Sequence, residues 1–239
     1  MEVIGIDISP QMKPDDTPGN FWPELDDINE TLLHQSNKFD LVQSRMVGGG
    51  INASRWSSYM RDIKRVLKPG GWLQMIECYF MCQSNNGSIT DAHPIRRWSN
   101  KYIESLSGIK DPRAPLRLQS LFNAAGFVEI EHRMIQLPLC GWPDGMSEGS
   151  ENYIYCSLTL YLADDVTDSR ERRIGEENRD NIQQALSTLA IYPFTSRLGM
   201  SIQEVRALVA SARVDAANPK LKAYFPLWVW LAARSLLTV

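Results

Sequence analysis

The sequence has few residues that bind metals, and its cysteines do not form a metal-binding pattern. The 239 residues include four cysteines and three histidines, with no Cys-x-x-Cys pair. Structural zinc sites need four such ligands at regular, close spacing. We therefore expect no metal site, and we expect free buried thiols rather than disulfides.

Long apolar runs and a secretion signal are also missing. The longest nearly apolar stretch, 223–233, contains Pro226 and is much shorter than the roughly 20 residues that span a membrane. The N-terminus has no basic segment followed by an apolar one, so no signal peptide is indicated. We expect no membrane partner and a cytoplasmic location, with the nucleus as the other possibility.

Positive charge is not concentrated anywhere in the chain. The formal net charge is −3, and the short basic spots at 96–97 and 170–173 resemble solvated helix faces. A nucleic-acid surface usually shows clustered Lys and Arg. We therefore expect no nucleic-acid partner.

The chain opens on an apolar strand that ends in an acid. Residues 3–8 read Val-Ile-Gly-Ile-Asp-Ile and lead into the polar turn at Ser9. In α/β nucleotide-binding sheets, a glycine-rich turn after the first strand holds the ligand, and an acid about 20 residues later binds ribose hydroxyls. Asp7 matches that acid, but no glycine-rich turn precedes it.

A βαβ unit follows. Residues 39–46 predict a short strand, and residues 56–67 have apolar side chains at helical spacing, with Asn52 as the expected cap. Pro69 and Gly70 end that helix before a strand at 72–77. The crossover predicts two parallel strands.

The remaining pattern predicts one α/β domain over residues 1–239. We expect a strand at 21–25, on an edge because of Pro23, helices at 91–107 and up to Gly126, a strand at 127–137, a helical stretch at 151–190, a capping box from Ser201 to Glu204, and a strand at 224–231. A core at 1–137 would be followed by a mainly helical lid insertion at 138–200. Residues 201–239 would complete the sheet.

Four segments in this order and spacing resemble one family. They are 3–10 (VIGIDISP), 25–28 (LDDI), 39–46 (FDLVQSRM) and 67–77 (LKPGGWLQMIE). Together with AYFPLWV at 223–229, they resemble class I S-adenosylmethionine-dependent methyltransferases, and within them the LaeA-like proteins of fungal secondary metabolism. The resemblance implies a Rossmann-like sheet and S-adenosylmethionine as the cofactor.

The resemblance also implies which residues bind the cofactor. Asp7 would accept hydrogen bonds from both ribose hydroxyls, Asp27 would meet the adenine amino group, and Ile28 would pack on the adenine ring. Asp26 is a further candidate for cofactor binding. Arg45, within Ser44–Met46, would lie near the methionine part. A strand-end acid that only caps a turn or stays solvated is the open alternative.

The family's first strand and its Gly-x-Gly turn have no counterpart before Val3. The neighbouring strands must then either expose backbone groups or pair directly with each other. Two explanations remain open: a gene start assigned at an internal methionine, or a short protein with another task.

The catalytic residue is less evident. His93, in the turn 90–94, is the candidate base, and an inactive surface histidine is the alternative. Trp98, Trp142 and Met146 are candidates for the walls of a substrate pocket, or for ordinary packing.

We therefore predict a methyltransferase acting on a small apolar intermediate of secondary metabolism. The first alternative is a cofactor-free protein of the same fold that steers a cyclisation or suppresses side products. The second is a LaeA-like regulator that binds protein partners.

Overall fold

The computed structural model describes residues 1–12, 16–142 and 169–236. Its strands are β1 (Val3–Asp7), β2 (Phe21–Leu25), β3 (Phe39–Arg45), β4 (Leu67–Cys78), β5 (Gln83–Ser84), β6 (Phe127–Pro138) and β7 (Ala223–Arg234). Its α-helices are α1 (Trp56–Val66), α2 (Pro94–Leu106), α3 (Leu118–Ala125), α4 (Ser169–Thr188), α5 (Ile191–Leu198) and α6 (Ile202–Ala216). Short 3₁₀ turns lie at Pro10–Met12, Ala114–Leu116 and Pro219–Leu221. The mixed α/β fold confirms the predicted fold class.

The main sheet has five strands and grows from the βαβ unit. β3 and β4 are parallel, as predicted, and β4 pairs antiparallel with β7. β7 also pairs antiparallel with β5 and β6. A Cβ on Gly71 would lie 2.9 Å from the Lys68 carbonyl oxygen, so the close passage of the chain at the start of β4 requires glycine there.

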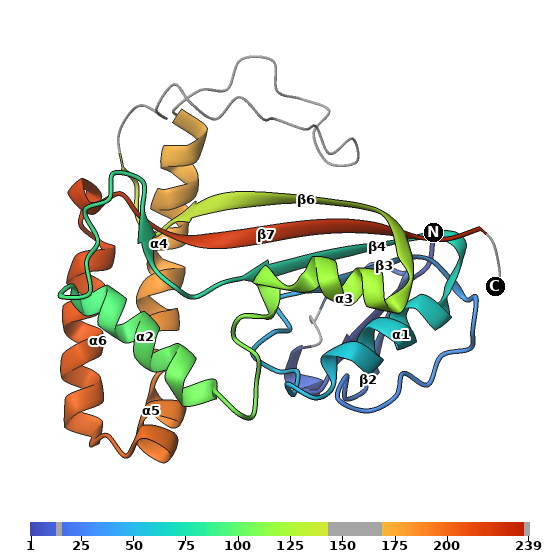
Figure 1. Cartoon of the computed structure of the whole chain (residues 1–239), viewed down its shortest axis with the longest axis horizontal. Helices are drawn as coiled ribbons and strands as arrows, with labels where there is room; N and C mark the ends of the chain where they lie inside the picture. Colours follow the sequence, from blue (N-terminus) through green and yellow to red (C-terminus); the bar gives the residue numbers. More distant parts are fainter. Residues whose placement is uncertain (13–15, 143–168, 237–239) are drawn as a thin grey trace.

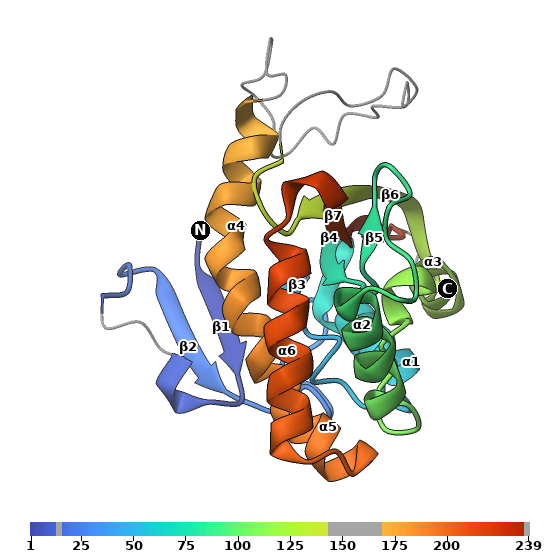
Figure 2. The ribbon, with the colours of Figure 1, turned by 90° about the vertical axis from the view of Figure 1, so that its left-hand side faces the viewer.

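β1 and β2 form a separate parallel pair (Figure 2). Among the described strands, β1 pairs only with β2, and β3 pairs only with β4. The sequence left open whether these strands would pair directly or expose backbone groups. The structure has unpaired edges on β1 and β3 among the described strands. β2 is an edge strand, as Pro23 predicts.

Two hydrophobic cores flank the main sheet (Figure 1). α1 and α3 cover one face, where Trp56, Met60 and Ile63 of α1 are buried at the helical spacing seen in the sequence. The second core lies among α2, α4, α5 and α6 at one end of the sheet. Trp98 is fully buried there, and its indole N–H donates to the Leu186 carbonyl oxygen at 2.9 Å.

Several helix ends follow local sequence signals. Gly126 ends α3 in the left-handed conformation, with φ of 77°, and Ser201 and Glu204 form the predicted capping box at the start of α6. The Asn52 prediction is wrong, because α1 starts after Arg55 without a side-chain cap. The side chain of Asn52 instead accepts a hydrogen bond from Lys110 Nζ at 2.9 Å.

Candidate functional site

A backbone hydrogen bond joins the carboxyl ends of β1 and β2, and side-chain bonds order the turn after each strand. The N–H of Asp26 donates to the Asp7 carbonyl oxygen at 3.1 Å, and the N–H of Asp27 donates to Asp26 Oδ1 at 2.9 Å. The Asp7 carboxylate accepts from the N–H of Ser9 at 2.7 Å and is exposed. The acids predicted from the sequence therefore lie together at one end of this strand pair.

Asn29 links this pair of strands to the main sheet. Its Nδ2 donates to Asp27 Oδ1 at 3.0 Å and to the Gly50 carbonyl oxygen at 3.2 Å. Its Oδ1 accepts from the N–H of Asn52 at 2.8 Å. The loop after β2 and the loop after β3 are thus held side by side.

The same residue fixes the charge of Asp27. The backbone N–H of Asn29, and then its side-chain amide, hold the pKa of the Asp27 carboxyl below its ordinary value. Lys110, whose ammonium donates to the Gly50 carbonyl oxygen, adds a smaller lowering. Ile28 packs beside them against the core under α1. An ionised acid next to an apolar side chain suits a polar ring such as adenine.

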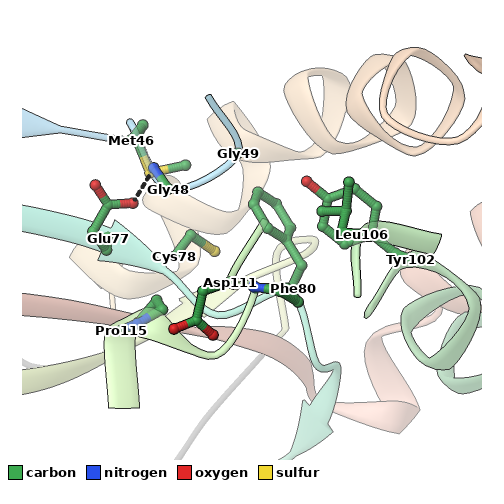
Figure 3. A pocket seen from close by; sticks show the side chains of 11 residues that line it. Met46, Gly48, Gly49, Glu77, Cys78, Phe80, Tyr102, Leu106, Asp111 and Pro115 are labelled. Atoms are coloured by element: carbon green, nitrogen blue, oxygen red, sulfur yellow. Dashed lines mark hydrogen bonds between the residues drawn. The ribbon is translucent and has the colours of Figure 1, made fainter. Parts of the chain in front are cut away.

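Glu77 connects the loop after β3 to the end of β4. Its Oε1 accepts from the N–H of Val47 at 2.9 Å. Its Oε2 accepts from the N–H of Gly48 at 3.0 Å (Figure 3). A Cβ on Gly48 would lie 2.9 Å from Glu77 Oε2, so a larger residue there would make the carboxylate or the loop shift. Hydrogen bonds thus run from the ends of β1 and β2 through the loop after β3 to Glu77 at the end of β4.

Glu77 also lines a small pocket. Glu77 is 2% exposed, and burial raises the pKa of its carboxyl to about 7 against the lowering effect of the two backbone N–H groups. The cavity has a volume of about 30 Å³. Its lining comes from the ends of β3, β4 and α2 and from the segment before α3: Met46, Gly48, Gly49, Glu77, Cys78, Phe80, Tyr102, Leu106, Asp111, Pro112 and Pro115.

Arg45 and His93, also predicted from the sequence, are not among the residues that line this pocket. Arg45 is exposed at the end of β3, next to the lining residue Met46. His93 lies at the first turn of α2, where its Nδ1 is 3.0 Å from the Thr90 backbone nitrogen. Tyr102 is further along the same helix, about 14 Å away at 1.5 Å per residue. The base role of His93 stays a prediction.

The predicted wall residues are placed differently. Trp98 is a core residue, and the Trp142 indole N–H donates to the Ala223 carbonyl oxygen at 3.3 Å. Met146 lies outside the described residues. In the proposed lid, residues 138–142 and 169–200 are described, and none of them lines the pocket.

Sequence reasoning missed Glu77, Tyr102 and Asp111 as site residues. Glu77 had a readable signal, because it ends an apolar strand as Asp7 does. Tyr102 and Asp111 had no such signal in the sequence. They line the pocket because α2 and the segment after it pack against the ends of β3 and β4.

Comparison with known proteins finds similar chains. Residues 1–75 match the family described as a methyltransferase domain. The chain is 24% identical over 238 residues to the secondary metabolism regulator laeA of Aspergillus fumigatus, covering 98% of this chain and 56% of that protein. The chain is therefore similar to laeA over nearly its whole length, and its N-terminal third matches a methyltransferase domain.

A second laeA protein and one solved methyltransferase structure are also similar to the chain. The Emericella nidulans protein named protein-methionine methyltransferase laeA is 22% identical over 98% of this chain and 56% of its own length. The Haemonchus contortus phosphoethanolamine N-methyltransferase 2, solved with S-adenosyl-L-methionine, superposes with a TM-score of 0.50 at 17% identity, over 98% of this chain and 43% of that one. The chain spans 56% of the length of each of the two laeA proteins.

No helix in the described ranges combines the length and hydropathy needed to cross a membrane.

Proposed function

We propose that this chain binds S-adenosylmethionine at the ends of β1–β3 and transfers its methyl group to a small apolar acceptor in the Glu77 pocket. One observation carries the proposal. Hydrogen bonds run from Asp7 through Asn29 to Gly50, and from Gly48 to Glu77, so the acids after β1 and β2 adjoin the pocket. Ligands of such sheets bind beyond the carboxyl ends of the strands.

The residues present fit the adenosine part of this cofactor. Asp7 offers an exposed carboxylate for the ribose hydroxyls, and one of its oxygens already accepts from Ser9. Asp27 offers an acceptor for an adenine amino group, with Ile28 as its apolar neighbour. β1 and β3 are not paired with each other among the described strands, and the loop after β3 is joined to the loop after β2 by the hydrogen bond from Asn29 to the Gly50 carbonyl oxygen.

The bound cofactor supplies an electrophilic methyl group on a sulfonium. The protein's part is to orient the reacting groups and exclude water. Gly48 and Gly49 line the pocket beside Glu77, and Glu77 fixes the Val47–Gly48 backbone through two hydrogen bonds. The apolar walls favour an acceptor of low polarity, in keeping with an intermediate of fungal secondary metabolism.

Calorimetric titration of S-adenosylmethionine into the purified chain tests the proposal. We expect binding that weakens on the order of tenfold or more in Asp7→Ala, since charge-assisted hydrogen bonds are lost. Asp91→Ala is the matched control, because Asp91 is an exposed acid outside this site. A folded chain that does not bind the cofactor would contradict methyl transfer.

A regulatory role through protein contacts is the second candidate. The unpaired edges of β1 and β3 favour it, because such edges bind extended segments of other chains, and curated relatives are named secondary metabolism regulators. Under this function, Asp7→Ala leaves the biological output unchanged, whereas a change on an unpaired strand edge abolishes it.

A further inference from the structure

The pocket contains one buried carboxylate without a cationic partner in the described parts of the chain. Within the described ranges, Glu77 accepts hydrogen bonds from two backbone N–H groups, those of Val47 and Gly48. The other acid that lines the pocket, Asp111, forms an ion pair with Arg117. Each carboxylate oxygen can accept more than one hydrogen bond, so Glu77 retains acceptor capacity toward a ligand.

Tyr102 contributes a hydroxyl on the other side of the pocket. Its ring stacks on Trp98 with a centroid distance of 5.3 Å and meets Phe80 edge-on at 5.3 Å, which fixes its position. Burial raises the pKa of Tyr102 to about 12, with a smaller contribution from Cys78, so the hydroxyl keeps its proton near neutral pH. A Cβ on Gly49 would lie 3.6 Å from this hydroxyl oxygen. The Tyr102 hydroxyl therefore faces the loop after β3, whose Gly48 donates a hydrogen bond to Glu77.

The remaining lining selects the charge of the acceptor. The walls include Met46, Phe80, Leu106 and Pro115, and among the described residues no Lys or Arg lines the pocket (Figure 3). A phosphate or carboxylate acceptor would meet Glu77 without compensation. An amine would be held in its ammonium form by the carboxylate and would lack the lone pair that attacks a methyl group. A neutral hydroxyl meets neither obstacle.

We propose that the acceptor is a neutral hydroxyl group, that Glu77 is the catalytic base that receives its proton, and that Tyr102 orients it. This inference rests on the proposed methyl transfer. The acceptor oxygen forms a bond to the methyl carbon, and the bond from that carbon to the donor sulfonium breaks, with its electron pair left on sulfur. The hydroxyl proton passes to a Glu77 carboxylate oxygen. The products are a methyl ether, a neutral thioether and protonated Glu77, which then loses the proton to water.

Among the neighbouring groups with a shifted pKa, Glu77 is the one whose carboxyl changes charge near neutral pH. Burial raises the pKa of Tyr59 on α1 and of Cys78 on β4, so both stay neutral, as does Tyr102. Asp111 is held as an ion pair by Arg117. A hydroxyl ligand that donates to the carboxylate should therefore favour the ionised form of Glu77 and lower its pKa.

Phenol and anisole test the site without the methyl donor, because anisole has the same ring and oxygen but no hydroxyl proton. Binding is measured by calorimetry, and Glu77 is followed by carbon-13 NMR of its labelled carboxyl. We expect phenol to bind on the order of tenfold more tightly than anisole at about pH 8, where Glu77 is a carboxylate. Phenol should lower the Glu77 pKa, and anisole should leave it unchanged.

Three variants complete the test. Glu77→Gln should remove the preference for phenol, and Tyr102→Phe should reduce it. Glu104→Gln makes the same chemical change on the exposed side of α2 and should keep the preference. If Glu77→Gln does not fold, the wild-type NMR titration decides.

Equal binding of phenol and anisole, binding of neither, or an unchanged Glu77 pKa would overturn the inference. The cofactor titration fails or succeeds independently. If the chain binds phenol as expected but does not bind S-adenosylmethionine, Glu77 binds hydroxyl groups, but both methyl transfer and the role of Glu77 as its base are wrong. If the chain binds the cofactor but does not prefer phenol to anisole, the proposed hydroxyl acceptor is wrong and the proposed cofactor binding is not affected.

Discussion

Glu77 accepts a hydrogen bond from the backbone N–H of Gly48 at 3.0 Å, across 29 residues of sequence. This bond and its partner at Val47 hold the loop after β3 against the end of β4. Burial raises the pKa of the same carboxyl to about 7. One side chain therefore both shapes the pocket and supplies a group that titrates near neutral pH.

Glu77→Gln should change how stability depends on pH. The folded chain binds the Glu77 proton more tightly than the unfolded chain, whose value is near 4.5. This contribution to the free energy of unfolding is full below about pH 4.5 and is lost as pH rises through about 7, a total of about 3 kcal/mol. Urea unfolding at about pH 5 and about pH 8 measures it. The same change in the free energy of unfolding between these two pH values in wild type and Glu77→Gln would contradict the prediction.

Gly48→Ala should destabilise the site. The added Cβ would lie 2.9 Å from Glu77 Oε2, so the carboxylate or the loop must shift. We expect a loss of about 1–3 kcal/mol in the free energy of unfolding. Gly19→Ala is the control, since a Cβ there meets nothing within 4 Å. Losses of the same size in both variants would show that crowding at Glu77 is not the cause.

Asn29→Ala should loosen the β1–β2 pair more than the main sheet. The variant removes the bonds to Asp27, Gly50 and Asn52 that join the two loops, at about 0.5–1.5 kcal/mol each. Amide hydrogen exchange should rise in β1 and β2 and stay unchanged in β7. Asn123→Ala, on the exposed side of α3, should change neither. Uniform exchange across both sheets would refute the prediction.

Leu41→Lys should reduce self-association of the chain. Leu41 is 57% exposed on β3, whose second edge is unpaired among the described strands, and apolar edges promote intermolecular pairing. Sedimentation velocity should show fewer oligomers, with stability within about 0.5 kcal/mol of wild type. Leu33→Lys adds the same charge at an 86% exposed loop position. An equal effect there would mean that net charge, not the edge, is responsible.

The sequence predicted the elements whose causes are local. The βαβ unit, the end of α3 at Gly126, the capping box at Ser201 and the strands β6 and β7 all follow from periodicity, glycine and capping within a few residues. The acids at the ends of β1 and β2 were also readable, because a strand that ends in a polar turn is a local pattern.

Only the tertiary structure decided the rest. Asn52 resembled a cap in sequence, yet its partners are Asn29 and Lys110, on other loops. Sheet pairing left β1–β2 separate from the main sheet, a choice between two outcomes that the sequence left open. The pocket joins Glu77 to Tyr102 and Gly48, which are distant in the chain. Its chemistry depends on burial and on contacts between elements, and neither is encoded in any short stretch of sequence.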